Sequence, residues 1–439
     1  MATEKVQQLN GNPEASKGVG KVRICVIGAG PSGLMTLRAL QSLDVNKFEI
    51  ICYERHSEIG GIWNFRAVEG LDEDGMEPHS AAYHELKVNS SKWLEECPEF
   101  PFEERVEDYP TWQNNLAYLN KFTNHFGLRD TIKFKFWVDW VQFDTENQKF
   151  AVTISDLTDD KHQKTTKIFD YVIVGNGRYN KPNYVTFTGE ETFPGKILHA
   201  KYFHDPKRYA GQRVLLVGSS FSVEDFACLL TKAGAAQIDV SSRRPQMIIT
   251  LPASVTKHPL PTKIEGSSVT FEDGATDCYD VIIYCTGYLD DFPFLEDSLQ
   301  TVRRRKLAVE LYKQVVHPKC PRLMFIGMST ILYSFSIYWV QGHLCAKLIN
   351  GDFSLPGPTE MEEEIEQFVE ADSKLKGLQD VINFQSERII ALGELVGKKD
   401  LDRRHIVQAW TRDRQNDILN YRENCTTAEA AAKKLRGLF

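Results

Sequence analysis

Apolar runs and helical spacings alternate at the start of the chain. Residues 21–30, KVRICVIGAG, are an apolar run ending in glycines, which predicts a buried strand and a tight turn. In 31–43, PSGLMTLRALQSL, leucines recur at helical spacing, and 48–54, FEIICYE, predicts a second strand. The order strand, turn, helix, strand is the opening of a doubly wound α/β sheet.

Further elements are predicted between this opening and residue 180. Gly, Pro and aromatic residues dominate 60–110 and indicate long ordered loops, whereas 113–126 has a helical pattern. Residues 132–143 and 149–157 alternate like an antiparallel pair of strands. The run 170–177, DYVIVGNG, predicts a short buried strand that ends in Gly.

A second copy of this plan follows the Pro- and Gly-containing segment 178–195, which marks a boundary. Residues 213–234 predict strand, turn and helix, and 236–244 predict the next strand. The closing run 280–287, DVIIYCTG, has the form of 170–177: Asp, an apolar strand, then Asn or Thr, then Gly. The chain therefore predicts two α/β units of one kind.

One long apolar segment and a charged C-terminal region complete the pattern. Residues 323–346 contain no Lys, Arg, Asp or Glu, which reaches the length of a bilayer span. Their Ser, Gly, Gln and His residues would be costly in lipid, so we expect a buried strand, a Ser-rich turn and a buried helix. Helical patterns at 361–397 and 403–422 predict a C-terminal extension.

Composition narrows the functional classes. The net charge of −8 gives no basic surface for nucleic acid, and the eleven His have no metal-ligand spacing. The nine Cys are irregularly spaced without a C-x-x-C, which disfavours a disulfide framework or zinc site and favours a reducing compartment. The polar first twenty residues have no secretory pattern. We expect a cytoplasmic protein that binds neither metal nor nucleic acid and has no membrane span. The composition does not decide whether it forms a homo-oligomer.

The first candidate site is Gly28-x-Gly30-x-x-Gly33. Glycines in this pattern permit a sharp turn, close approach of backbone to a pyrophosphate, and tight packing of helix on strand. Phosphates then lie at the amides of the helix N-terminus. Glu54 ends the next strand, where an acid binds ribose hydroxyls. This context favours FAD over the alternative of a glycine turn beside a surface Glu.

The second turn, GSSFSV at 218–223, keeps only the first glycine of that pattern. Its strand, turn and helix context still predicts a dinucleotide site. Arg243 and Arg244 follow the next strand where an NAD-binding fold places an acid. Guanidinium groups there suit a 2′-phosphate and therefore predict NADP rather than NAD. The alternative is that both arginines are exposed to solvent and bind no ligand.

Two dinucleotide units in one chain imply hydride transfer from nicotinamide to flavin. Disulfide reductases of this architecture need a Cys pair beside the flavin, and the sequence offers none. Oxygen is therefore the expected electron acceptor.

The chain closely resembles the flavin-containing monooxygenase family, the class B flavoprotein monooxygenases. The resemblance covers about residues 20–350 and is carried by GAGPSG (28–33), YERHSEIGGIWNF (53–65), YHELKVNSSK (83–92), FPGKILHAKYF (193–203), GSSFSVED (218–225) and YCTGYLDDFPFL (284–295). FPGKILHAKYF matches the family pattern F-x-G-x-x-x-H-x-x-x-[YF]. The C-terminal part is more similar to the short soluble members: bacterial trimethylamine monooxygenases and insect N-oxygenases of pyrrolizidine alkaloids.

The resemblance implies an NADPH- and O2-dependent enzyme that oxygenates tertiary amines or sulfides through a C4a-hydroperoxyflavin. A Baeyer–Villiger oxygenase is an alternative, although those enzymes end the motif in Trp where this chain has Phe203. An NADPH oxidase releasing hydrogen peroxide and a non-catalytic flavin-binding sensor are two others. His199 in the same motif is as compatible with a structural role as with a catalytic one.

The site residues implied by the motifs and the resemblance fall into three groups. Asn89 is expected beside the flavin in a catalytic role, although Asn89-Ser90-Ser91 is also a glycosylation pattern. FAD is expected to contact Gly28, Gly30, Pro31, Ser32, Gly33, Glu54, Arg55, Gly61, Ile62, Trp63, Asn89, Val138 and Ser329. NADP is expected to contact Ser90, Gly218, Ser219, Ser220, Phe221, Ser222, Arg243 and Arg244. The family usually has Asn where Phe221 stands, which is a departure in the NADP turn.

The expected fold class is α/β, with two Rossmann-like units and C-terminal helices, the NADP unit being inserted in the FAD unit. The expected limits are a polar leader (1–20), the FAD unit (21–178), the NADP unit (179–290), the return of the FAD unit (291–350) and the helical extension (351–439).

Overall fold

The computed structural model describes residues 20–66, 70–72, 74–159, 161–243, 250–300, 302, 304, 307–328 and 332–425. Its first sheet is five-stranded and parallel, in the order β18-β7-β1-β2-β3. The strands are β1 (Val22–Ile27), β2 (Phe48–Glu54), β3 (Ile132–Phe134), β7 (Tyr171–Val174) and β18 (Leu323–Phe325). The near-continuous burial of β1 and β7 is what a parallel sheet covered on both faces requires.

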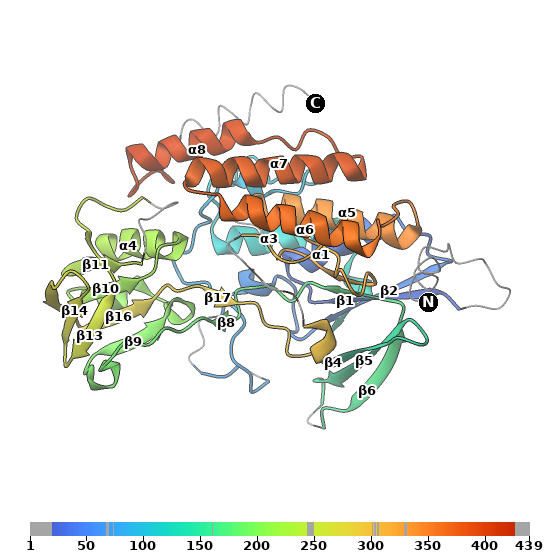
Figure 1. Ribbon diagram of the computed structural model, residues 1–439, viewed down its shortest axis with the longest axis horizontal. Coiled ribbons are helices and arrows are strands. Elements are labelled where there is room, and N and C mark those ends of the chain that lie inside the picture. Colours follow the sequence, from blue (N-terminus) through green and yellow to red (C-terminus); the bar gives the residue numbers. More distant parts are fainter. Residues whose placement is uncertain are drawn as a thin grey trace.

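A second parallel sheet has the order β12-β11-β10-β16-β9. Its strands are β9 (Lys196–His199), β10 (Arg213–Val217), β11 (Gln237–Ser241), β12 (Thr256–His258) and β16 (Val281–Tyr284). All five lie between β7 and β18 in the chain, so the second unit interrupts the first (Figure 1). The predicted fold class, with two Rossmann-like units and C-terminal helices, is confirmed.

The repeated Asp of the two units has the same structural role in each. Asp170 Oδ2 accepts a hydrogen bond of 2.8 Å from the backbone N–H of Arg23, at the start of β1. Asp280 Oδ2 accepts one of the same length from the backbone N–H of Arg213, at the start of β10. Each Asp thus aligns the strand that follows it with the first strand of its own unit.

Helices cover both sheets (Figure 1). In the first unit α1 (Pro31–Leu40) packs on α5 (Ser334–Asn350) so closely that a Cβ on Gly342 would lie 2.9 Å from the Cα of Thr36. The other helices are α2 (Lys92–Glu95), α3 (Trp112–His125), α4 (Phe221–Ala233), α6 (Pro358–Ser373), α7 (Leu378–Val396) and α8 (Arg404–Asn416). Figure 1 shows α5, α6, α7 and α8 stacked over the first unit, with α8 reaching toward α4.

Smaller sheets include β4 (Phe136–Asp144), β5 (Lys149–Asp156) and β6 (Lys164–Phe169), which are antiparallel. The predicted pairing of 132–143 with 149–157 is wrong at its start, because β3 joins β2 in the parallel sheet. Lys135, with a φ of 61°, turns the chain between β3 and β4. The second unit carries β13 (Pro261–Glu265), β14 (Ser268–Phe271) and β15 (Thr276–Cys278), and β8 (Lys181–Pro182) pairs with β17 (Tyr288–Leu289) where the chain passes between the units.

The C-terminal patterns divide differently from the prediction. The range 361–397 forms two helices, α6 and α7, because 374–377 breaks the helix and Gly377 begins the next one. The range 403–422 is helical only as far as Asn416. As expected, the apolar range 323–346 contains β18 and most of α5, both buried.

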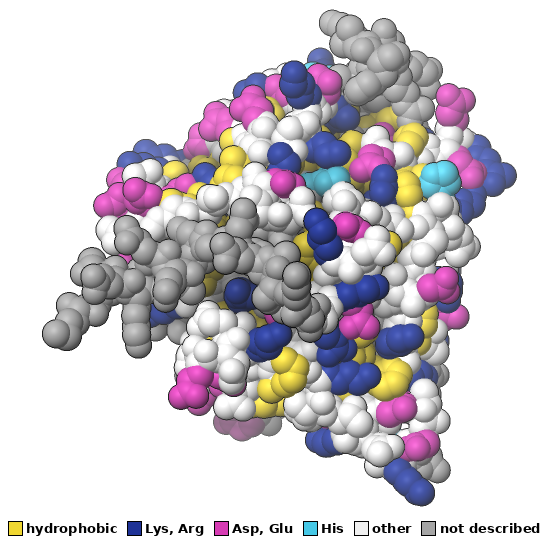
Figure 2. All heavy atoms as spheres, turned by 90° about the vertical axis from the view of Figure 1, so that its right-hand side faces the viewer, with side chains coloured by type: hydrophobic (Ala, Val, Ile, Leu, Met, Phe, Trp, Pro, Cys, Tyr) yellow, Lys and Arg dark blue, Asp and Glu magenta, His cyan; other side chains and the backbone are white. Residues whose placement is uncertain are grey.

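Within the described ranges, no helix combines the length and apolar character that crossing a bilayer requires. On the face in Figure 2, Lys and Arg lie among Asp and Glu, and hydrophobic side chains form small separate patches.

Candidate functional site

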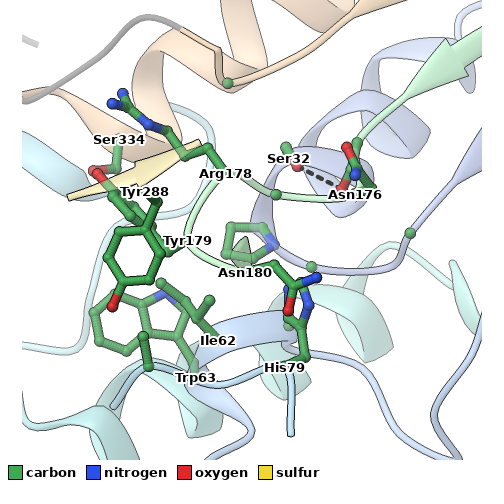
Figure 3. A pocket seen from close by; sticks show the side chains of 18 of the residues that line it. Ser32, Ile62, Trp63, His79, Asn176, Arg178, Tyr179, Asn180, Tyr288 and Ser334 are labelled. Carbon is green, nitrogen blue, oxygen red and sulfur yellow. Dashed lines mark hydrogen bonds between the residues drawn. The ribbon is translucent and has the colours of Figure 1, made fainter. Parts of the chain in front are cut away.

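A cavity of about 530 Å³ opens where the two units meet, which is a volume typical of ligand sites. It brings together residues far apart in the sequence, from the turns after β1, β2, β7 and β16 and from α4 and α5 (Figure 3). Of the residues expected at FAD, those lining it are Gly28, Gly30, Pro31, Ser32, Glu54, Arg55, Gly61, Ile62, Trp63, Asn89 and Val138. Of those expected at NADP, Ser90, Ser220, Phe221 and Ser222 line it.

Of the other expected contacts, those that the structure describes do not line this cavity. Gly33 lies within α1, and Gly218 and Ser219 lie three and two residues before the start of α4. Arg243 is exposed beyond the end of β11. Ser329 and Arg244 lie outside the described residues.

The turn between β1 and α1 has the shape that a pyrophosphate needs. A Cβ on Gly33 would lie 1.9 Å from the carbonyl oxygen of Gly28, so this glycine lets helix pack on strand. A Cβ on Gly30 would meet no protein atom closer than 3.5 Å and would project at the mouth of α1, beside the cavity. Protein packing explains Gly33 but leaves room at Gly30, which fits a phosphate lying against the backbone at the helix N-terminus.

Glu54 stands at the cavity end of β2 and is 5% exposed. Its Oε2 accepts a hydrogen bond of 2.7 Å from the N–H of Ala29, and its Oε1 accepts one of 2.9 Å from the N–H of His56. Burial raises the pKa of this carboxyl, and the two backbone hydrogen bonds oppose that shift. A carboxylate has lone pairs left after two such bonds, so Glu54 can hold the glycine turn and still accept from ribose hydroxyls.

The degenerate second turn has a similar packing. A Cβ on Gly218 would lie 2.3 Å from the carbonyl oxygen of Cys285, as one on Gly28 would lie 2.7 Å from that of Gly175. Only glycine permits this approach of the first strand to the closing strand. Ser220 is the N-cap of α4 and makes no side-chain cap hydrogen bond, so the start of α4 has no side-chain cap where Ser220, Phe221 and Ser222 line the cavity.

Asn89 borders the cavity and is held from the C-terminal extension. Its side-chain Oδ1 accepts a hydrogen bond of 2.7 Å from Nη2 of Arg422, and its backbone oxygen accepts one of 2.7 Å from Nε1 of Trp410. More than 300 residues separate these partners from Asn89, and no local pattern in the sequence could have indicated them.

Glu95, at the end of α2, is a lining residue that the sequence did not single out. It is 5% exposed, and its Oε1 accepts a hydrogen bond of 3.0 Å from the hydroxyl of Ser90. Burial raises the pKa of Glu95 to about 8, against the opposing effect of that hydrogen bond. A pKa of about 8 favours the neutral form of the Glu95 carboxyl at pH 7, hydrogen-bonded to the residue that follows Asn89.

Ionisation of Glu95 is expected to weaken the site at alkaline pH. A carboxyl whose pKa is raised on folding stabilises the folded state fully below its unfolded pKa, and this contribution is lost progressively as the pH rises from there to about 8. We expect the thermal stability of the protein to fall between pH 5 and 8 and to level off above, and the FAD affinity to fall as Glu95 ionises near pH 8. Glu95→Gln should remove this fall, whereas Glu103→Gln, at an exposed carboxyl, should retain it. A Glu95→Gln protein with the wild-type pH profile would contradict the assignment.

The remaining wall of the cavity is largely aromatic. Figure 3 shows Trp63, Tyr179 and Tyr288 toward one side, with Ser32 and Asn176 toward the other. Phe335 and Tyr338 line it from α5, within the apolar range 323–346. No cysteine is among the described residues that line this cavity.

The side chains of His199 and Phe203, in the motif 193–203, have structural roles. His199 is fully buried; its Nε2 donates to the carbonyl oxygen of Gly287 at 2.9 Å, and its Nδ1 accepts from the N–H of Lys201 at 3.1 Å. Burial lowers the pKa of His199 to about 4, so the ring is neutral. Phe203 stacks on Phe226 with ring centroids 3.9 Å apart in the core of the second unit. Neither side chain lines the cavity.

Two parallel α/β units, each with the start of its first helix at one shared cavity, are the arrangement of an oxidoreductase that uses two dinucleotides. The chain belongs to the flavin-binding monooxygenase-like family, whose model matches residues 21–263 and 245–403. It is therefore a flavin-dependent monooxygenase, and the members of this family use FAD and NADPH with O2.

Individual relatives are consistent with that membership. The chain is 34% identical over 413 residues to trimethylamine monooxygenase of Methylocella silvestris, covering 92% of this chain and 91% of the relative. It is 29% identical to senecionine N-oxygenase of Tyria jacobaeae, covering 82% and 79%. The structure of S-allyl-L-cysteine S-oxygenase from Allium sativum matches with a TM-score of 0.82 at 25% identity, covering 96% of this chain and 99% of that one.

Proposed function

We propose that this enzyme uses NADPH and O2 to oxygenate the nitrogen of tertiary amines or the sulfur of thioethers. One observation carries the proposal: a single cavity is bordered by the turn before α1, the first turn of α4 and Asn89. A flavin held at the first turn and a nicotinamide approaching from the second would meet inside it. The named activities of the relatives, on trimethylamine, senecionine and a cysteine thioether, support this substrate class.

The residues present fit both cofactors. We assign the FAD pyrophosphate to Gly30 and the first turn of α1, and its ribose to Glu54. We assign NADP to Ser220, Phe221 and Ser222 at α4, with its 2′-phosphate at Arg243 and Arg244. The same assignment divides the chain into an FAD unit (21–178 and 291–350) and an NADP unit (179–290).

Bound FAD would supply the redox chemistry, taking hydride from NADPH and activating O2. The protein side chains would position the substrate and keep water out of the cavity. The aromatic wall of Trp63, Tyr288 and Tyr338 excludes water and accommodates an apolar amine or thioether. Asn89 would offer its side-chain amide to the bound cofactor or substrate, and Glu95 would offer a neutral carboxylic acid. The overall reaction consumes NADPH, a proton, O2 and the substrate, and yields NADP⁺, water and the N-oxide or S-oxide.

This proposal is tested by product analysis under ¹⁸O2. Purified enzyme with FAD and NADPH is given trimethylamine, a tertiary-amine alkaloid, a thioether and a cyclic ketone. We expect one labelled oxygen in an N-oxide or S-oxide, with peroxide well below the NADPH consumed. Stoichiometric peroxide with every substrate would establish an oxidase instead. Conversion of the ketone to an ester would establish a Baeyer–Villiger enzyme.

The NADP assignment predicts a coenzyme preference. Replacing Arg243 and Arg244 by Ala should raise the Michaelis constant for NADPH by about tenfold or more, since each charge-assisted hydrogen bond to phosphate is lost. The constant for NADH, which lacks the phosphate, should change little. Lys263→Ala, at an exposed cation of the same unit, should leave both constants unchanged. Equal increases for both coenzymes would show that the arginines do not bind the 2′-phosphate.

A further inference from the structure

The C-terminal segment that follows α8 lies between the two dinucleotide units. Arg422 donates to both of them: its Nη2 to Asn89 Oδ1 at 2.7 Å, and its Nη1 to Asp225 Oδ1 at 2.5 Å. Asn89 precedes α2 in the first unit, whereas Asp225 lies in α4 of the second. One guanidinium group thus joins a side chain bordering the cavity to helix α4 of the second unit.

These two hydrogen bonds are shielded from water. The side chain of Asp225 is 2% exposed and that of Arg422 is 12% exposed. Asp225 also accepts a hydrogen bond from the hydroxyl of Tyr83, another lining residue, so its carboxylate is held both by the first unit and by the C-terminal segment. Charge-assisted hydrogen bonds away from water are stronger than neutral ones and hold a defined geometry.

Helix α8 makes a parallel set of contacts. The ring nitrogen of Trp410 donates to the backbone oxygen of Asn89, while the Trp410 ring lies 6.1 Å from the ring of Phe221, which borders the cavity from α4. Arg414 lies over both of these rings, 4.3 Å and 5.3 Å from their centroids. The backbone and the side chain of Asn89 are therefore both held by residues after 400, which also hold α4.

We propose that Arg422 is a positioning residue: it orients the Asn89 amide at the cavity and fixes the first turn of α4 at a set distance from it. The planar guanidinium suits this role because its two branches point at fixed angles to two acceptors. With Asn89 Oδ1 accepting from Arg422, the amide N–H2 of Asn89 is turned away from that contact. The role of Arg422 in the reaction rests on the proposed function, whereas its contacts with Asn89 and Asp225 do not.

The test compares Arg422→Ala and Arg422→Lys with Arg412→Ala, all in the FAD-loaded enzyme. Arg412 is exposed on α8 and serves as the matched control. Lysine keeps the charge but lacks the planar fork, so it separates positioning from simple charge pairing. Three quantities are measured: the NADP⁺ dissociation constant from changes in the flavin spectrum, the peroxide released per NADPH, and deuterium uptake of a peptide spanning 84–91.

We expect both Arg422 variants to retain flavin and to bind NADP⁺ about tenfold more weakly, because Asn89 and α4 are no longer held in one arrangement. The peroxide fraction should rise several-fold, and 84–91 should exchange faster. Arg412→Ala should match wild type in all three. If Arg422→Ala does not fold, Arg422→Lys and Asp225→Asn carry the test.

Wild-type NADP⁺ affinity and wild-type exchange at 84–91 in the Arg422 variants would overturn the inference. The exchange and binding measurements need no turnover, so they remain decisive even if no amine or thioether is oxygenated. Failure of the proposed function would show instead in the ¹⁸O2 experiment.

Discussion

Gly33→Ala is expected to destroy the first dinucleotide unit. The added Cβ would lie 1.9 Å from the carbonyl oxygen of Gly28, a backbone atom at the start of the same turn. Relief requires α1 to move away from β1, and α1 is clamped from its other side by α5. We expect the free energy of unfolding to fall by about 3 kcal/mol or more, and the purified protein to be colourless. Urea unfolding and the flavin absorbance measure the two effects.

Gly30→Ala separates folding from flavin binding. A Cβ there meets protein only at ordinary contact distance, 3.5 Å from the Cα of Gly61, in a backbone conformation that alanine adopts. The free energy of unfolding should change by no more than about 1 kcal/mol, the usual effect at an N-cap. Flavin should still be lost, because the methyl group occupies the position assigned to the pyrophosphate. Gly20→Ala, with open space around it, should change neither. A yellow, stable Gly33→Ala protein would contradict the packing of α1.

Local patterns in the sequence were sufficient to predict the two α/β units and their strand-to-helix turns. Strand, turn and helix are encoded within about thirty residues, and the contact that requires glycine at Gly33, with Gly28, is made within that span. The close approach of Gly28 is to Gly175, in a distant segment, so the sequence indicated this glycine only through the motif. Even the degenerate turn at Gly218 was recognisable, since its context survives where the other glycines do not. The β3 error arose for a related reason: alternation predicts a strand but does not indicate its partner, and Lys135 turns the chain between two sheets.

The rest of the site depends on contacts between distant segments. Glu95 lies in the range 60–110, for which the sequence predicted only long ordered loops, and only the folded chain buries it against Ser90. Arg422 follows a charged helix and resembles any surface arginine in sequence. Its role depends on its hydrogen bonds to Asn89 and Asp225, which lie 333 and 197 residues away in the sequence. Patterns of hydrophobicity cannot report such pairs, because nothing in either segment alone requires the other.

Arg414→Met is expected to be the most destabilising change in the C-terminal helices. The side chains of Arg414 and Glu224 are 1% and 3% exposed, and the guanidinium binds both carboxylate oxygens, Nε lying 3.1 Å from Oε1. Methionine retains most of the volume but leaves Glu224 buried without its cation. Removing one partner of a buried pair costs about 3–5 kcal/mol, so we expect a loss of that size in urea unfolding.

The pH dependence of this loss identifies its cause. Burial already raises the pKa of Glu224, and the attraction of Arg414 opposes that shift. Without Arg414 the pKa rises further, so the carboxyl takes up a proton in the folded state and the penalty shrinks as the pH falls from 8 to 5. The double variant Arg414→Met/Glu224→Gln should lose less than Arg414→Met alone, because no charge remains buried. Arg412→Met, exposed on the same helix, should stay within about 0.5 kcal/mol of wild type. A loss for Arg414→Met that is equal at both pH values would place its origin in packing against Trp410 and Phe221 rather than in the buried charge.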